Sequence, residues 1–115
     1  MNQWHDAAQS AFRGIRPGTS LVTSSYVLAE CANAFARSDL RSQLVRLGER
    51  LGSEGLLIFP SDADWHEAWT RFSREHPGSA SLTDQLSFTV MRRLGLRQAF
   101  TNVGHFAGAG FEALF

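Results

Sequence analysis

The hydrophobic residues of this chain recur mostly with the period of an α-helix. Apolar side chains at every third or fourth position form one stripe per segment, the pattern of a helix that packs on one face. Ser24 or Ser25 can cap one helix, while Ser61 and Ser81 each stand three residues before an aspartate, as in a capping box. The pattern predicts helices over roughly residues 3–13, 25–37, 39–51, 62–72 and 82–94.

Short apolar or β-branched runs, too short for helices, interrupt these segments. The clearest is 56–59, which is continuously apolar between Gly55 and Pro60, as in a buried parallel strand. Strands are predicted at 19–23, 56–59, 98–101 and 111–115, with a glycine-rich loop before the last. Alternating strands and helices favour an α/β fold, a mainly parallel sheet flanked by helices. A sheet of this kind normally opens on its central strand, whereas this chain opens on a helix.

The length and composition predict one small soluble domain over residues 1–115. With 43% hydrophobic residues, no apolar run long enough for a membrane span and no visible signal peptide, we expect a cytoplasmic protein. The single Cys31 fits a reducing compartment. The 11 basic residues are all arginine and are balanced by 11 acids, so any contact with nucleic acid must be local. The absence of lysine is typical of a GC-rich bacterial genome.

Two acidic residues occupy positions where parallel sheets carry their functional groups. Glu30 lies in the first turns of the helix that follows the first predicted strand, and Asp84 lies in the first turn of the helix before 98–101. Carboxylates gathered there would suit Mg²⁺ or Mn²⁺. The alternative is structural: Asp84 completes a capping box, and Glu30 pairs with Arg37 or another arginine. Spacing alone favours this second interpretation.

Other candidate sites are weaker. The four histidines show no zinc-ligand spacing. The stripe of Trp65, Trp69 and Phe72 is interpreted as core or partner interface rather than a platform for stacking bases. Three arginines near the third strand could meet phosphates: Arg92, Arg93 and Arg97.

Several segments together resemble the PIN-domain family, and specifically VapC-type toxins. The stretch LVTSSYVLAE at 21–30 resembles the family segment that ends in its second acidic residue, and SLTD at 81–84 resembles the segment with the third. The ending AFTNVGHF at 99–106 is similar to the family's closing motif, and HDAA at 5–8 is similar to its first helix. The likeness covers nearly the whole chain.

This resemblance implies a Mg²⁺- or Mn²⁺-dependent endoribonuclease that cleaves RNA with metal-activated water. It assigns Glu30 and Asp84 as catalytic metal ligands, with Thr83 and Ser87 as supporting polar neighbours. It further implies a toxin of a type II toxin–antitoxin system, neutralised by a small antitoxin protein that lies across helical grooves, and a homodimer.

The sequence departs from the family pattern at two of four acidic positions. The first family aspartate ends an opening strand that has no match before Asn2, and Val103 stands where the closing motif usually has an acid. Two carboxylates should hold Mg²⁺ only weakly. A start codon assigned too far downstream, a decaying gene, or a strand supplied by a second copy or partner would each account for the first departure. We therefore carry a second hypothesis, an inactive PIN remnant that binds an antitoxin, and a third, a plain structural or regulatory domain.

Overall fold

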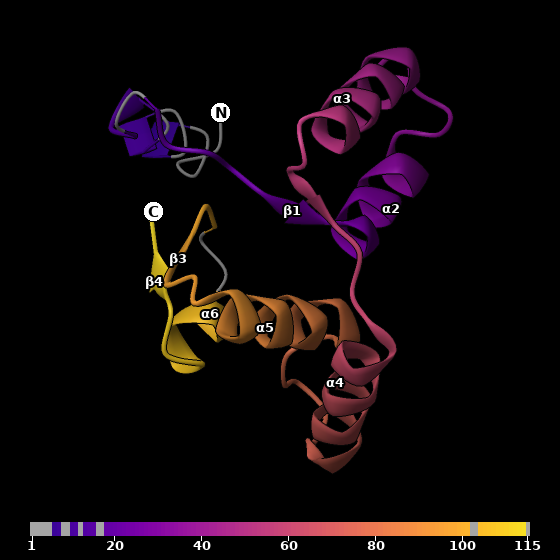
Figure 1. Cartoon of the computed structure of the whole chain (residues 1–115). Coiled ribbons are helices and arrows are strands. Elements are labelled where there is room, and N and C mark those ends of the chain that lie inside the picture. The colour runs from indigo at the N-terminus through magenta and orange to yellow at the C-terminus, as the bar shows by residue number, and fades with distance from the viewer. Residues whose placement is uncertain (1–5, 8–9, 12, 16–17, 102–103, 115) are drawn as a thin grey trace.

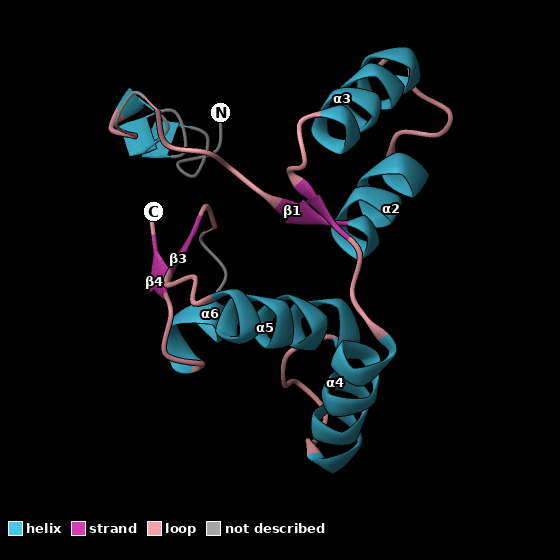
Figure 2. Ribbon diagram, viewed as in Figure 1, coloured by secondary structure: helices cyan, strands magenta, loops and turns pink. Residues whose placement is uncertain are grey.

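Helices and very short strands alternate along the chain in the computed structural model, as Figures 1 and 2 show. The structure describes residues 6–7, 10–11, 13–15, 18–101 and 104–114. Residues 6–7, 10–11 and 13 are helical, and the rest of the predicted first helix lies outside the described residues. The other elements, in order, are β1 Thr23–Ser24, α2 Ser25–Ala34, α3 Arg41–Ser53, β2 Leu57–Ile58, α4 Asp62–Arg74, α5 Leu82–Leu94, β3 Gln98–Ala99, α6 Gly104–Gly108 and β4 Glu112–Ala113.

The predicted parallel pairing is confirmed, but the strands form two ladders of two strands each. β1 pairs with β2 in the register Thr23 to Leu57, and β3 pairs with β4 in the register Gln98 to Glu112. Within the described residues no strand joins β1 to β3, so each strand is paired along one edge only. The strands are consequently shorter than predicted.

Some helix boundaries differ from those predicted from the sequence. α2 ends at Ala34 and Phe35 closes it, earlier than the expected end at Arg37. α3 begins at Arg41 instead of Asp39, and no side chain caps its start. The glycine-rich loop predicted before the last strand contains the five-residue helix α6. In the described part of the chain, no helix is both long enough and apolar enough to cross a membrane.

The buried residues concentrate on α5. Leu86 is completely buried, and Phe88, Val90 and Met91 are almost so. α5 packs against α4 on one side, where Ala68 is fully buried. On the other side the Phe88 ring meets the Phe106 ring edge to face at 4.8 Å. Edge-to-face pairs add to the free energy gained by burial alone, so α5 joins α4 to the C-terminal elements.

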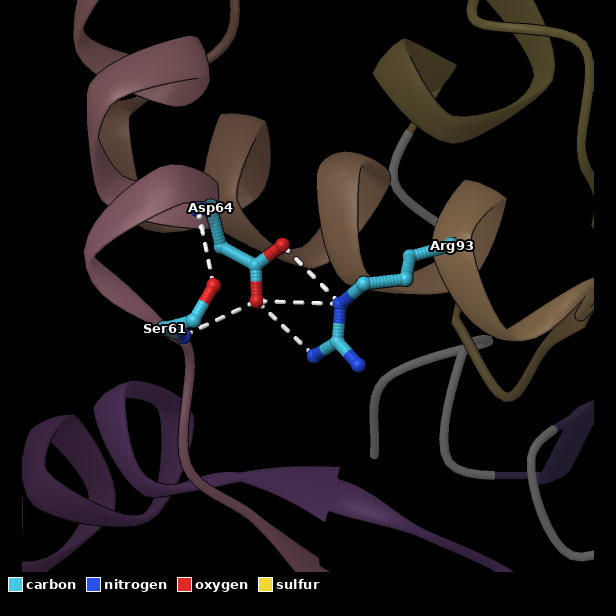
Figure 3. A network of polar contacts seen from close by, with 3 residues as sticks. All are labelled: Ser61, Asp64 and Arg93. Carbon is cyan, nitrogen blue, oxygen red and sulfur yellow. Dashed lines mark hydrogen bonds and ion pairs between the residues drawn. The ribbon is translucent and has the colours of Figure 1, made fainter.

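A capping box and an ion pair fix the start of α4 to the end of α5 (Figure 3). The Ser61 hydroxyl accepts from the Asp64 amide at 3.1 Å, and the Asp64 carboxylate accepts from the Ser61 amide at 2.9 Å. The same carboxylate accepts from the Arg93 guanidinium, at 3.0 Å from Nε and 2.8 Å from Nη2. Asp64 is only 4% exposed, so this carboxylate depends on its hydrogen bonds to stay charged. The Arg93 guanidinium, against the opposing effect of burial, lowers the pKa of Asp64.

A row of stacked aromatic rings lies on the surface of α2 and α4. Tyr26 stacks on Trp65 at 5.9 Å and Trp65 on Trp69 at 5.7 Å, and Phe72 follows Trp69 at 6.3 Å. All four side chains are between 37% and 49% exposed. Of the two interpretations of Trp65, Trp69 and Phe72, core is wrong, because α4 turns Ala68 and Asp64 inward instead, and partner interface stays a prediction.

Replacing Arg93 tests how far the α4–α5 contact relies on the ion pair. In Arg93→Met the Asp64 carboxylate stays buried without its bidentate partner. We expect the free energy of unfolding to fall by about 2 kcal/mol, less than for a fully buried pair because Arg93 is 46% exposed. Urea denaturation measures the change. Arg50→Met is the control: its pair with Glu54 is solvent-exposed, so a loss of under about 0.5 kcal/mol is expected. Equal losses in both variants would rule out a special role for Arg93.

The lowered pKa of Asp64 also predicts how the contribution of this pair depends on pH. A carboxyl whose pKa is lower in the folded state stabilises the fold fully above its ordinary value of 3.8. That stabilisation is lost as the pH falls through the lowered folded pKa. Wild type should therefore exceed Asp64→Asn in free energy of unfolding at pH 6, by about 1–2 kcal/mol. The difference should shrink towards pH 2. A difference that stays constant over this range contradicts the assignment.

Candidate functional site at the start of α5

Asp84 lies in the first turn of α5, and its carboxylate is not used to cap the helix. The Ser81 hydroxyl accepts from the Asp84 amide at 3.1 Å, which caps the helix from one direction. The reciprocal bond from the Ser81 amide, present at Ser61 and Asp64, is absent here. Asp84 thus forms only one of the two hydrogen bonds of a capping box. Its side chain is 25% exposed, and its carboxylate oxygens can accept from another group.

The nearest charged partner of Asp84 is His105 on α6. The His105 Nδ1 atom lies 3.9 Å from the Asp84 Oδ2 atom, an ion pair when the imidazole is protonated. The prediction from sequence set His105 aside with the other scattered histidines. Its 21-residue separation from Asp84 carries no local signal, and the short helix that places it was not predicted.

Glu30 lies on α2 and is exposed to solvent. No residue of α2 is buried, so the apolar neighbours of Glu30 do not force its carboxylate to find a partner. The alternative that Glu30 turns to solvent and pairs with Arg37 or another arginine is met in part: Glu30 is exposed, but it forms no ion pair within the described part of the chain. α2 does contact α5, the helix that carries Asp84.

Thr83 and Ser87 flank Asp84 on α5, and both are half-buried. Ser87 stands three residues after Asp84, which places it on the same side of the helix. Neither hydroxyl forms a hydrogen bond among residues 18–101 and the other described positions. Both can therefore serve a ligand bound beside Asp84, as expected of supporting polar groups.

The carboxylates of Glu30 and Asp84 have the right chemistry for Mg²⁺ or Mn²⁺, but their number does not make a closed site. Among the described residues no group of three or more His, Cys, Asp or Glu side chains gathers in metal-binding geometry. Mg²⁺ requires six oxygens and gives up its water reluctantly. Val103, at the fourth acidic position of the resemblance, lies outside the described residues. These residues alone therefore offer a weak and open site.

An apolar groove lies between α2 and α3. Its volume is about 490 Å³. Most of its walls are aliphatic, with Arg41 and Glu49 at the rim. The lining residues are Leu28, Ala32, Asn33, Ala36, Arg41, Leu44, Val45, Gly48 and Glu49. A groove with mainly apolar walls can accept the apolar face of a helix.

Comparison with known proteins gives a structural match. No protein-family model and no curated protein matches the sequence. The crystal structure of Mycobacterium tuberculosis VapC20, described as a toxin that cleaves the sarcin-ricin loop, matches this chain with a TM-score of 0.75. Sequence identity is 26%, and the match covers 96% of this chain and 84% of VapC20.

The match supports the resemblance to VapC-type proteins that the motifs indicated. The α/β fold class with parallel strands is confirmed by the same comparison and by the strand pairing. The chain is a VapC-like protein with a PIN-type α/β fold.

Proposed function

We propose that this chain is the toxin of a type II toxin–antitoxin pair and acts as a metal-dependent endoribonuclease. The observation that supports it most is the Asp84 carboxylate, which the fold holds at the start of α5 without using it as a cap. The structural match to VapC20, a toxin that cleaves an RNA loop, supports RNA as the substrate. Residues Glu30 and Asp84 would hold Mg²⁺ or Mn²⁺ weakly, with Thr83 and Ser87 nearby.

A bound divalent cation would supply an activated water and neutralise charge on the phosphodiester. The residues of the chain would do the positioning. Asp84 presents its carboxylate from a helix fixed by the α4–α5 core, so its place is set by the most buried part of the molecule. Protonated His105, 3.9 Å away, would compete with a cation for Asp84, whereas the neutral imidazole would not.

Cleavage of RNA in Mg²⁺ or Mn²⁺ tests the role of Asp84. Asp84→Asn removes the charge of the side chain and keeps its shape. We expect the cleavage rate to fall at least about a hundredfold, because the transition state loses the stabilisation that the metal supplies. Gel analysis of a labelled RNA measures the rate. Asp62→Asn is the matched control because Asp62 occupies the first turn of α4. If Asp84→Asn cuts as fast as wild type, the assignment of Asp84 as a metal ligand is wrong.

The partner we propose is an antitoxin whose apolar helix lies in the α2–α3 groove. Val45 lines this groove and is 52% exposed, so a charge there should change binding with little effect on the fold. For the protein encoded by a small reading frame beside the gene, we expect Val45→Asp to weaken the complex about tenfold or more. Isothermal titration calorimetry measures this.

Trp69→Ser is the control for this experiment because Trp69 lies on the aromatic row, outside the groove. It should leave antitoxin binding unchanged. If Trp69→Ser abolishes the complex and Val45→Asp does not, the antitoxin binds the aromatic row instead.

The same row, with its four exposed rings, is the surface on which we place the homodimer expected from the resemblance. Analytical ultracentrifugation tests this placement: wild type should sediment as a dimer and Trp69→Ser as a monomer.

A further inference from the structure

A second cavity runs along α5, from Gln85 beside the candidate site to Arg92 near the end of the helix, and several hydrogen-bond donors line it. Its volume is about 400 Å³, and α4, the turn after it, α5 and α6 all contribute to its wall. The polar side chains of its lining are Arg71, Glu75, Ser79, Gln85, Arg92 and His105. The sequence indicated Arg92 as a possible phosphate contact but not the cavity itself, because the lining residues come from four separate segments.

Gln85 is the most buried polar residue at the cavity. It is 6% exposed, and its side-chain amide forms no hydrogen bond with any of the described residues. The Gln85 amide is not among the fully buried polar groups that lack a partner in the described residues, so it is open to solvent in the cavity. A ligand that enters the cavity can hydrogen-bond this amide in place of water.

Arg92 is a cation at this cavity without a carboxylate partner in the described structure. Its neighbour Arg93 pairs with Asp64, and Arg71 pairs with Glu67 at 3.4 Å. Arg92 instead lies over the ring of Phe111, with Cζ 5.6 Å from the ring centre. A guanidinium held by its flat face keeps its N–H groups free at the edge, where phosphate oxygens bind.

Arg92 is the group at the cavity that favours an anion most. Arg71 also lines the cavity but shares its charge with Glu67, and Glu75 is the acidic side chain of the lining. The Gln85 amide and the Ser79 hydroxyl can donate as well. His105 belongs to the same lining and also lies 3.9 Å from Asp84, so the cavity continues towards the candidate site.

We propose that this cavity binds a backbone phosphate of the RNA strand and so leads the strand to Asp84. The proposal rests on RNA as the substrate in the proposed function, but it concerns binding and does not depend on cleavage. Arg92 is the main contact and Arg71 the second. Gln85 donates through its amide, and Glu75 opposes the bound anion.

Binding of RNA in the absence of divalent metal tests this. The probe is a fluorescein-labelled single-stranded oligouridine of about twelve nucleotides, followed by anisotropy in EDTA. We expect Arg92→Gln to weaken binding on the order of tenfold and to reduce the salt slope by about 0.7. Glu75→Gln should strengthen binding about threefold, because it removes the opposing charge. Arg50→Gln, on exposed α3 outside the cavity, should bind as wild type does.

The outcomes separate this proposal from the proposed function. If the wild-type protein binds the RNA but does not cleave it in Mg²⁺ or Mn²⁺, the proposed nuclease activity is wrong and the cavity assignment stands. Equal weakening in Arg92→Gln and Arg50→Gln would show diffuse attraction and overturn the cavity. So would wild-type binding weaker than about 100 μM, the level of non-specific contact. Displacement of the RNA by oligoaspartate of equal charge would assign the cavity to an acidic peptide. Glu75→Gln keeps the test decisive if Arg92→Gln unfolds.

Discussion

The contact between α4 and α5 is the constraint on which the rest of the molecule depends. Asp64 is almost fully buried and charged, and it is tolerated there because Ser61 and Arg93 together satisfy its oxygens. This contact sets the direction of α5, and α5 carries both Asp84 and Arg92. The candidate acidic site and the basic cavity are therefore positioned by the same helix. A shift of α5 would move both together.

Two identical spacings in the sequence show what local reasoning can and cannot predict. Ser61 with Asp64 and Ser81 with Asp84 both match a capping box, and both serines do cap their helices. The two carboxylates then differ in their partners. Asp64 accepts hydrogen bonds from Ser61 and Arg93, whereas Asp84 does not complete the capping box and lies 3.9 Å from His105. The starts of α4 and α5 and the end of α5 at Gly95, with its positive φ of 71°, follow from local chemistry. The partners of Asp64, Asp84 and Arg92 depend on tertiary packing.

In the described residues the parallel strands form two separate ladders instead of one sheet. β1 and β3 each keep one unpaired edge in the described structure. Leu21, Val22 and Phe100, beside these strands, are 39% to 43% exposed. A strand between them would pair both edges and cover apolar surface. VapC20 is matched over 84% of its length, so its chain contains residues beyond those compared here.

A chain with no net charge can still bind RNA if its charges are separated along the substrate path. The Debye length at physiological salt is about 8 Å, so phosphates respond to nearby groups and little to the total. Here the Asp84 carboxylate stands in the first turn of α5, while Arg92 stands near the end of this helix, and His105 contacts Asp84 and also lines the cavity. A phosphate would be attracted at one end, and a cation at the other. The neutral composition therefore excludes attraction over a distance but permits a short, oriented path for the strand.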